Sequence, residues 1–431
     1  MKVFKYPTKA HWSALLTRPV MSEKDLENVV SPILDAVKRD GDAALKQFTS
    51  QFDKVTISAF AVSEKEIQEA ESTLDERLKA AIRQAAENIR KFHQAQRENP
   101  IKVETMKGVE CWRKSVPIDK VGIYIPGGTA PLFSTVLMLA IPAVEAGCKE
   151  IVLCSPPSGN GKLHPAIIYA ATFSGVSKLF KVGGAQAIAA MAYGTPSIPR
   201  VFKIFGPGNQ YVTAAKQLVT RDGTAIDMPA GPSEVAVLAD ETANPHFIAA
   251  DLLSQAEHGA DSQVILVTTS SSVIERVVTT IDEQLVKLPR KEIAIKALEN
   301  SRVFLLSDEE ACIELLNEYA PEHLILSISN ADEVAEKITN AGSVFLGHFT
   351  PESVGDYASG TNHTLPTNGW ARSFSGVSLD SFFKKITFQK LSREGLQNIG
   401  ETVEVMAEAE GLEAHKQAVS IRLKWIKAEE Q

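Results

Sequence analysis

The stretch Val201–Val219, VFKIFGPGNQYVTAAKQLV, decides the fold of this chain. It begins with the apolar run Val201–Phe205, passes through a glycine-rich turn, and continues as a helix-like run from Gln210. A short apolar run bounded by glycine is typical of a buried strand, and a strand followed by a helix is the repeating unit of a parallel α/β sheet. The stretch therefore predicts an α/β fold.

The same alternation extends through the middle of the chain. The first group of predicted strands is Val121–Ile125, Glu150–Cys154, Leu179–Val182 and Val201–Phe205. The helices that follow these strands are predicted at Thr135–Ala146, Pro165–Phe173, Ala187–Tyr193 and Gln210–Val219. A second group of strands is predicted at Glu234–Leu238, Gln263–Thr268, Val303–Leu305, His323–Ile328 and Ser343–Leu346. Two such groups predict two α/β units in tandem, each with a parallel sheet.

The two ends of the chain depart from this pattern. Residues Glu64–Arg97 and Leu391–Trp425 are rich in helix-forming residues, and Gly411 interrupts the second run. The expected parts are an N-terminal arm (1–22), a discontinuous α/β domain (23–123 and 234–377), a second α/β domain (124–233) and a helical C-terminal extension (378–431). Terminal segments of this kind often contact a partner subunit.

Composition limits the function classes. A chain of 431 residues suggests two or three domains, and 44% hydrophobic with 23% charged residues is ordinary for a globular enzyme. A net charge of −8 argues against nucleic-acid or acidic-membrane binding as the main role. No apolar run is long enough to span a bilayer, and the first residues lead into no signal-type segment. Four cysteines without a CxxC pair favour a reduced cytoplasm.

A predicted helix ends in residues that could bind a metal. Asn244 and Pro245 supply a cap and a proline at the first helical position, and Gly259 suits the left-handed conformation that ends many helices. Near that end, Gln255 and His258 are spaced i, i+3 and so share one face. An amide oxygen and an imidazole on one face can hold a divalent metal, although most such pairs are solvated surface.

Two other features carry possible chemistry. The glycine-rich turns Pro126–Thr129 and Gly206–Asn209 follow predicted strands at the carboxyl end, where open α/β sheets bind ligands, but neither is a GxGxxG fingerprint. Glu322 and His323 lie between a probable helix and a strand, where both side chains can reach one pocket and act as bases. On the residues alone, the turns are as readily explained as tight turns without a ligand, and a solvated charged pair is the favoured interpretation of Glu322 and His323.

The chain as a whole resembles the histidinol dehydrogenases, the zinc enzymes that complete histidine biosynthesis. The matching motifs are Val121–Gly128 (VGIYIPGG), Lys181–Gln186 (KVGGAQ), Gly206–Gln210 (GPGNQ), Asp227–Glu234 (DMPAGPSE), Asp251–Gly259 (DLLSQAEHG), Tyr319–Leu324 (YAPEHL), Gly355–His363 (GDYASGTNH) and Glu408–Ala418. The resemblance implies incomplete Rossmann-like domains, NAD as cofactor, and one zinc ion per subunit of a homodimer.

The resemblance also implies roles for particular residues. The residues that match the family's NAD contacts are Tyr124, Gln186 and Asn209. Those that match its zinc ligands are Gln255, His258, Asp356 and His415, the last reaching the partner's active site from the C-terminal extension. The zinc ligands and His323 also surround the substrate, together with Ser233, His363 and Glu410. The implied reaction is a two-step oxidation of L-histidinol through the aldehyde to L-histidine. In it His323 removes the alcohol and gem-diol protons and Glu322 activates water.

Other classes of protein share parts of this pattern. A cysteine-based aldehyde dehydrogenase would pass through a thiohemiacetal and would use one of Cys111, Cys148, Cys154 and Cys312. A zinc hydrolase could use the same metal set with Glu322 as base, and it would leave the glycine-rich turns idle. A non-catalytic binding protein would not need two bases beside a metal set. Another alcohol substrate within the same superfamily would differ only in the pocket, where His363 and Glu410 favour histidinol.

Overall fold

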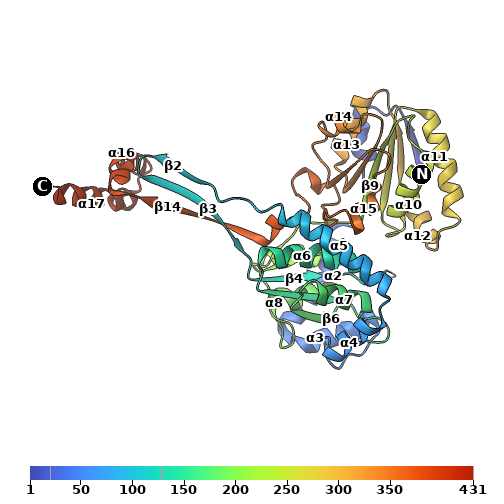
Figure 1. Cartoon of the computed structure of the whole chain (residues 1–431), viewed down its shortest axis with the longest axis horizontal. Helices are drawn as coiled ribbons and strands as arrows, with labels where there is room; N and C mark the ends of the chain where they lie inside the picture. The colour runs from blue at the N-terminus through green and yellow to red at the C-terminus, as the bar shows by residue number, and fades with distance from the viewer. Residues whose placement is uncertain (20, 128–129, 431) are drawn as a thin grey trace. The chain divides into compact units, whose positions relative to one another are not determined.

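A computed structural model describes residues 1–19, 21–127 and 130–430 of the chain (Figure 1). The chain forms two compact units. Unit 1 consists of Met1–Gln96 and Ile118–Phe382, and unit 2 of Arg97–Pro117 and Phe383–Gln431. The helices of the described residues lack the length and apolar character that a membrane crossing requires.

The first sheet of unit 1 follows the Rossmann strand order. Its parallel strands lie in the order β6-β5-β4-β7-β8, which places the first strand in the centre and reverses direction between β4 and β7. The bounds are β4 Lys120–Tyr124, β5 Glu150–Ser155, β6 Lys178–Lys181, β7 Lys203–Phe205 and β8 Ala225–Ile226. The expected incomplete Rossmann-like sheet is confirmed.

Helices cover both faces of this sheet. Those that follow its strands are α6 Phe133–Ala146, α7 Pro165–Phe173, α8 Gly184–Tyr193 and α9 Gln210–Thr220. The preceding ones are α2 Glu23–Asp40, α3 Asp42–Phe48, the π-helix η1 Thr49–Asp53, α4 Glu64–Thr73 and α5 Glu76–Gln94. Helix α2 packs on α8 and α9, α4 on α7, and α5 on α6. One continuous core joins the apolar face of α2 to α8, α9 and the sheet.

The second sheet of unit 1 repeats the same order. Its parallel strands lie in the order β1-β11-β10-β9-β12-β13, so the first and fourth strands of the repeat, β9 and β12, are again neighbours. The bounds are β1 Lys2–Lys5, β9 Glu234–Ala239, β10 Gln263–Thr268, β11 Arg302–Leu305, β12 His323–Ser327 and β13 Ser343–Leu346. Two sheets of the same topology confirm the tandem arrangement.

Two apolar layers enclose the second sheet. Its helices are α1 Lys9–Leu15, α10 Pro245–Ala256, α11 Ser271–Leu285, α12 Lys291–Glu299, α13 Glu309–Tyr319, α14 Ala331–Ala335 and α15 Glu352–Tyr357, followed by the 3₁₀ turns η2 Trp370–Arg372 and η3 Leu379–Phe382. One layer packs α10, α11 and α12 on the sheet, and the other packs α1, α13 and α14. The strands are apolar on both faces because both are covered.

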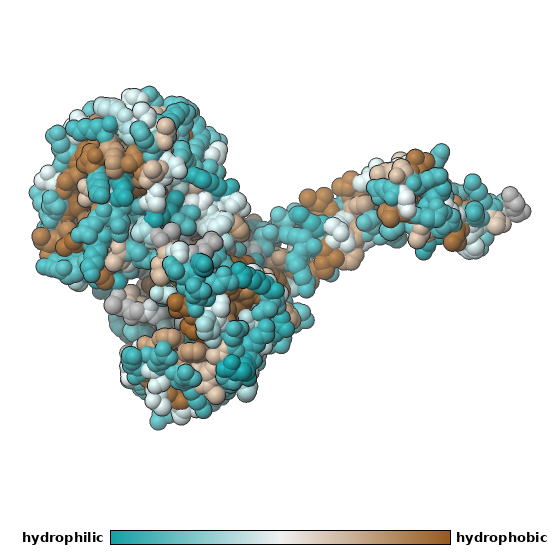
Figure 2. Space-filling view, turned by 180° about the vertical axis from the view of Figure 1, so that it is seen from behind, coloured by the Kyte–Doolittle hydropathy of each residue, from teal (hydrophilic) through white to brown (hydrophobic). Residues whose placement is uncertain are grey.

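Unit 2 is a narrow sheet that carries two helices. Its antiparallel strands are β2 Lys102–Met106, β3 Val109–Pro117 and β14 Phe383–Leu391, and the helices are α16 Arg393–Ala409 and α17 Glu413–Glu429. Gly411, with φ of 72°, joins the two helices, as expected for the helical C-terminal extension. Large apolar side chains remain exposed on this unit, including Val405, Met406 and Ile421 at about 60% (Figure 2).

The N-terminal segment does not form the predicted arm. Residues Lys2–Lys5 pair in parallel with Arg302–Leu305 and complete the edge of the second sheet. The helices of residues 23–96 also differ from the predicted division, because α2 and α4 pack on the helices of the first sheet rather than the second. Backbone pairing with β11 places the N-terminal segment, and apolar contacts with the helices of the first sheet place α2 and α4. The order of elements along the sequence predicts neither of them.

Candidate active site

A cavity of about 960 Å³ lies within unit 1 and is lined by residues from both sheets. Tyr124 and Asn209 line it from the carboxyl ends of β4 and β7, and Ser233 and Glu322 line it from the amino ends of β9 and β12. In both sheets, the two strands on either side of the reversal in strand order therefore contribute residues to the cavity. They do so from their carboxyl ends in the first sheet and from their amino ends in the second. Ligands of open α/β sheets usually lie at carboxyl ends, and only the first sheet follows that rule.

The cavity wall of the first sheet is tightly packed backbone. Tyr124 is buried, and its hydroxyl accepts a hydrogen bond of 3.0 Å from the Gly184 amide. Gly206 has φ of 125°, and a β-carbon there would lie 2.1 Å from the Tyr124 carbonyl oxygen. Only glycine allows this turn, so the backbone can approach a ligand closely. Gly128 and Thr129 of the other predicted turn lie outside the described residues.

Two amides on this wall have unused hydrogen-bonding capacity. Gln186 is 1% exposed, and its Oε1 atom has no hydrogen-bond partner among residues 1–19, 21–127 and 130–430. Asn209 caps helix α9 with its Oδ1 atom, which accepts from the Val212 amide at 3.0 Å, and its side-chain nitrogen stays available. A buried acceptor without a donor is costly and is expected where a ligand supplies the donor.

Helix α10 begins as predicted and ends differently. Asn244 caps it by accepting a hydrogen bond from His246, and Pro245 is its first residue. The helix stops at Ala256 with Glu257 in right-handed conformation, so the expected left-handed Gly259 is wrong. A β-carbon at Gly259 would lie 2.8 Å from Asp261 Oδ1, so a larger residue there would displace the Asp261 side chain.

Glu322 directly precedes strand β12 and lines the cavity, while His323, the first residue of β12, is buried beside it. Glu322 Oε2 lies 3.7 Å from His323 Nδ1. The backbone of Glu234 contacts both residues, because its amide donates to Glu322 Oε2 at 2.8 Å and its carbonyl oxygen lies 3.2 Å from His323 Nδ1. Strand pairing of β12 with β9 therefore fixes the pair at the amino edge of the sheet.

Burial and neighbouring carboxylates shift the pKa values of both residues upwards. Burial raises the pKa of Glu322 to about 8. Burial alone would lower the pKa of His323, but the carboxylates of Glu352, Glu322 and Asp356 raise it to about 10. Strongly shifted groups at the edge of a cavity are typical of active sites.

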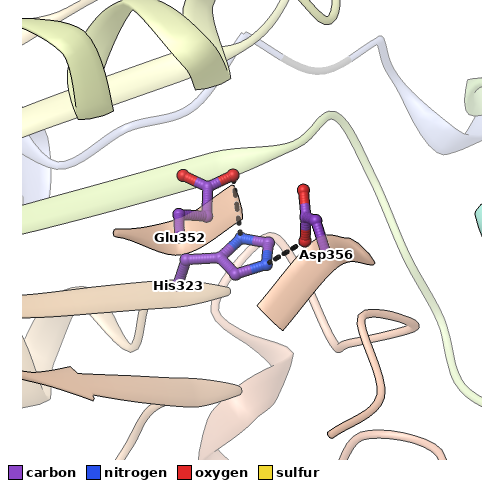
Figure 3. Close-up of side chains that lie close together, drawn as sticks. All are labelled: His323, Glu352 and Asp356. Atoms are coloured by element: carbon purple, nitrogen blue, oxygen red, sulfur yellow. Dashed lines mark ion pairs between the residues drawn. The ribbon is translucent and has the colours of Figure 1, made fainter. Parts of the chain in front are cut away.

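A cluster of three potential metal ligands surrounds the His323 ring. Oxygen and nitrogen atoms of His323, Glu352 and Asp356 lie within 4.8 Å of one another (Figure 3). His323 Nε2 is 3.5 Å from Asp356 Oδ1, and its Nδ1 is 4.0 Å from Glu352 Oε1. Glu352 is not among the site residues predicted from the sequence. The signal for it was its i, i+4 spacing from Asp356, which puts both carboxylates on one face of α15.

The other predicted ligands of unit 1 lie around this cluster. The amide of Gln255 faces the Glu352 carboxylate, with which its nitrogen can hydrogen bond. His258 is exposed to the cavity, where desolvation by the surrounding protein lowers its pKa although Asp356 acts in the opposite direction. His363 Nδ1 lies 2.8 Å from the Asp356 carbonyl oxygen, and its Nε2 lies 3.0 Å from the Thr135 hydroxyl.

The remaining predicted residues divide between the units. Ser233 lines the cavity of unit 1. Glu410 and His415 are exposed residues of unit 2, at the end of α16 and in the first turn of α17. Among the described residues, no cysteine lines the cavity, and burial raises the pKa of Cys148 and Cys312 to about 12. A thiolate route is therefore disfavoured.

The electrostatics of the cluster favour a cation. Burial raises the pKa of Asp251 to about 7 and that of Glu352 well above its usual range. His323 Nε2 and Asp356 Oδ1 are buried, lie 3.5 Å apart and, within the described ranges, accept or donate no hydrogen bond. Several desolvated carboxylates that share one imidazole are costly alone and are stabilised by a divalent ion.

Comparison with known proteins decides the family. The histidinol dehydrogenase family model matches residues 16–423. The chain belongs to the histidinol dehydrogenase family. It is 60% identical to the histidinol dehydrogenase of Bacteroides thetaiotaomicron over 427 residues, covering 99% of this chain and 100% of that protein. It is 52% identical to that of Escherichia coli K12 over 416 residues, covering 96% of this chain and 95% of that protein.

A solved histidinol dehydrogenase has the same fold. The crystal structure of the enzyme from Elizabethkingia anophelis superposes with a TM-score of 0.96 at 56% identity and covers 99% of both chains. Membership of the histidinol dehydrogenase family makes the protein an oxidoreductase of histidine biosynthesis, with the activity that names the family. The nucleic-acid and binding-protein alternatives are thereby excluded.

Proposed function

We propose that the chain oxidises L-histidinol through histidinaldehyde to L-histidine with NAD as hydride acceptor and a divalent metal, zinc by its donor set, holding the substrate. The observation that carries this proposal is the position of two bases, Glu322 in the cavity wall and His323 3.7 Å behind it, beside the carboxylates of Glu352 and Asp356. Four-electron oxidation of an alcohol needs a base for each proton removed. A cytoplasmic location accords with four free cysteines.

The residues of unit 1 fit a metal with mixed nitrogen and oxygen ligands. We assign His258, Asp356 and the amide oxygen of Gln255 as its ligands, with His415 of the partner subunit completing the protein set. Glu352 is then an outer residue, because a carboxylate that accepts from the Gln255 nitrogen leaves the amide oxygen free for the metal. When bound, the metal would orient the amine and imidazole of the substrate.

NAD would lie on the wall formed by the first sheet. Tyr124, Gln186 and Asn209 line this wall, and the unpaired Oε1 atom of Gln186 can accept from the ligand. The glycine turn at Gly206 lets the ligand approach the backbone. The carbinol carbon must lie between this wall and His323 for a hydride to leave towards NAD.

The proton steps follow from the two bases. His323 accepts the hydroxyl proton as hydride leaves the carbinol carbon, which yields the aldehyde. Glu322 then takes a proton from the water that adds to the aldehyde carbon, and His323 returns its proton to the former carbonyl oxygen, which completes the gem-diol. The neutral His323 then takes one gem-diol proton as the second hydride leaves. A cation bound by Asp356 opposes protonation of His323, since like charges repel, and so favours the neutral ring that must accept a proton.

Substrate recognition would use unit 1 of one subunit and unit 2 of its partner. Ser233 and His363 lie at the cavity, while a carboxylate such as Glu410 of the partner subunit can pair with the substrate amine. The exposed apolar residues of unit 2 are consistent with a covered interface.

The decisive experiment is a count of NADH. Metal-loaded protein should form two NADH per histidinol consumed, because both oxidations occur before release. A ratio of one with free aldehyde as product would contradict the two-step reaction. NAD-independent hydrolysis of histidinol esters or amides would support the hydrolase alternative instead.

Metal content should depend on His258. Replacing it in His258→Asn removes an imidazole ligand, so metal affinity and activity should fall together. Each loss should exceed the roughly 10- to 100-fold that loss of a residue supporting a ligand typically costs. The measurements are metal content after dialysis and histidinol oxidation. His246→Asn, an exposed histidine at the other end of the same helix, is the matched control. Parent metal content in His258→Asn would show that the ligand assignment is wrong.

A further inference from the structure

A buried ion pair lies directly behind the two bases. Arg18 contacts both carboxylate oxygens of Glu234, from Nε at 2.6 Å and from Nη2 at 2.8 Å. The two side chains are only 12% and 2% exposed. Nη2 also donates to the Tyr319 carbonyl oxygen at 2.6 Å, and the guanidinium carbon lies 3.9 Å from the centre of the Tyr319 ring. Together, these contacts fix the position and orientation of the guanidinium.

Glu234 connects this ion pair to the bases. It is the first residue of β9. The ends of strands open more readily than their centres, and the ion pair with Arg18 opposes this opening. The carboxylate of Glu234 also accepts from the Asn368 amide at 2.5 Å, while the backbone amide and carbonyl of Glu234 contact Glu322 and His323 at 2.8 and 3.2 Å. A movement of the Glu234 backbone would thus change the position of both bases.

We propose that Arg18 is a positioning residue for oxidation, which holds Glu322 and His323 in place through the side chain and backbone of Glu234. This inference rests on the proposed roles of the two bases. Arg18 belongs to the segment expected to be an arm, and it touches neither base itself.

Anchoring the N-terminal segment does not require the charge of Arg18. Gln263 Nε2 donates to the Thr17 carbonyl oxygen at 3.1 Å, and Tyr319 donates to Gln263 Oε1 at 3.0 Å. Strand β1 pairs with β11, and Trp12 and Leu16 are buried in the core. The N-terminal segment is therefore held by contacts that do not involve the guanidinium. By contrast, among residues 1–19, 21–127 and 130–430, Arg18 is the one cation that pairs with the Glu234 carboxylate.

The test compares three variants of the full-length, metal-loaded enzyme. Arg18→Lys keeps the charge but cannot make two parallel hydrogen bonds and a third to Tyr319. The double variant Arg18→Met with Glu234→Gln leaves no uncompensated buried charge, so it should fold. Arg90→Met is the control, because it breaks a partly buried pair with Glu145 between α5 and α6.

The expected result is a loss in kcat without a loss of binding. Arg18→Lys and the double variant should lower kcat by roughly 10- to 100-fold, the cost of about 1 Å of misplacement, with metal content and the KM for NAD unchanged. Arg90→Met should keep kcat. With histidinaldehyde as substrate, adding Arg18→Lys to Glu322→Gln should cost less than Arg18→Lys does alone, because the part of the Arg18 effect that acts through Glu322 is already lost.

Two results would overturn the inference. One is a folded double variant with kcat within about threefold of the parent, and the other is full additivity of Arg18→Lys with Glu322→Gln. If Glu322→Gln itself oxidised histidinaldehyde at the parent rate, the proposed function would fail instead, whatever Arg18 does. The two failures are therefore distinguishable.

Discussion

Glu322→Gln is expected to slow the oxidation of supplied histidinaldehyde by about 10²–10⁴-fold while the first hydride transfer from histidinol stays near the parent rate. Only the aldehyde step consumes a water molecule, and Glu322 is the buried carboxylate beside His323 that can take its proton. Replacing His323 with Asn should slow both steps, since one base serves both proton removals. Stopped-flow NADH formation with each substrate measures the two steps separately.

The matched control is Glu314→Gln, which changes an exposed carboxylate of helix α13, paired with Lys9, in the same chemical way. Both rates should stay at the parent level in this variant. Equal losses on histidinol and histidinaldehyde in Glu322→Gln would show that the division of labour is wrong.

Mixing an inactive His323→Asn variant with an inactive His415→Asn variant should restore activity to roughly a quarter of the parent level when subunits exchange at random. If His415 serves the partner's site, a heterodimer has one site with both defects and one with neither. Either variant alone has a defect in every site. Exchange is followed by native mass spectrometry and activity by NADH formation.

A pairing that cannot complement is the control for this experiment. His323→Asn mixed with His258→Asn should remain inactive, because both residues belong to unit 1 and every exchanged site keeps one defect. Verified exchange of the His323 and His415 variants without recovered activity would mean that His415 acts within its own chain.

The sequence by itself determined the local structure. Runs such as Gln263–Thr268 are buried on both faces and became strands within a few residues of their predicted bounds. Asn244 and Pro245 begin helix α10 as predicted, because a cap and a fixed φ act on the adjacent residues alone. The motifs identified the family, and the alternation of predicted strands with predicted helices indicated two α/β units, each with a parallel sheet.

Only the tertiary structure decided which residues meet at the cavity. Glu352 lies against His323 although 29 positions separate them in the printed sequence, and Arg18 lies behind the bases from a segment expected to be an arm. Gly259 lies against the Asp261 side chain and does not adopt the left-handed conformation that its position after the helix predicted. Such contacts depend on how β9, β12 and the helices pack across a sheet. Periodicity and capping, which act over only a few residues, cannot specify them.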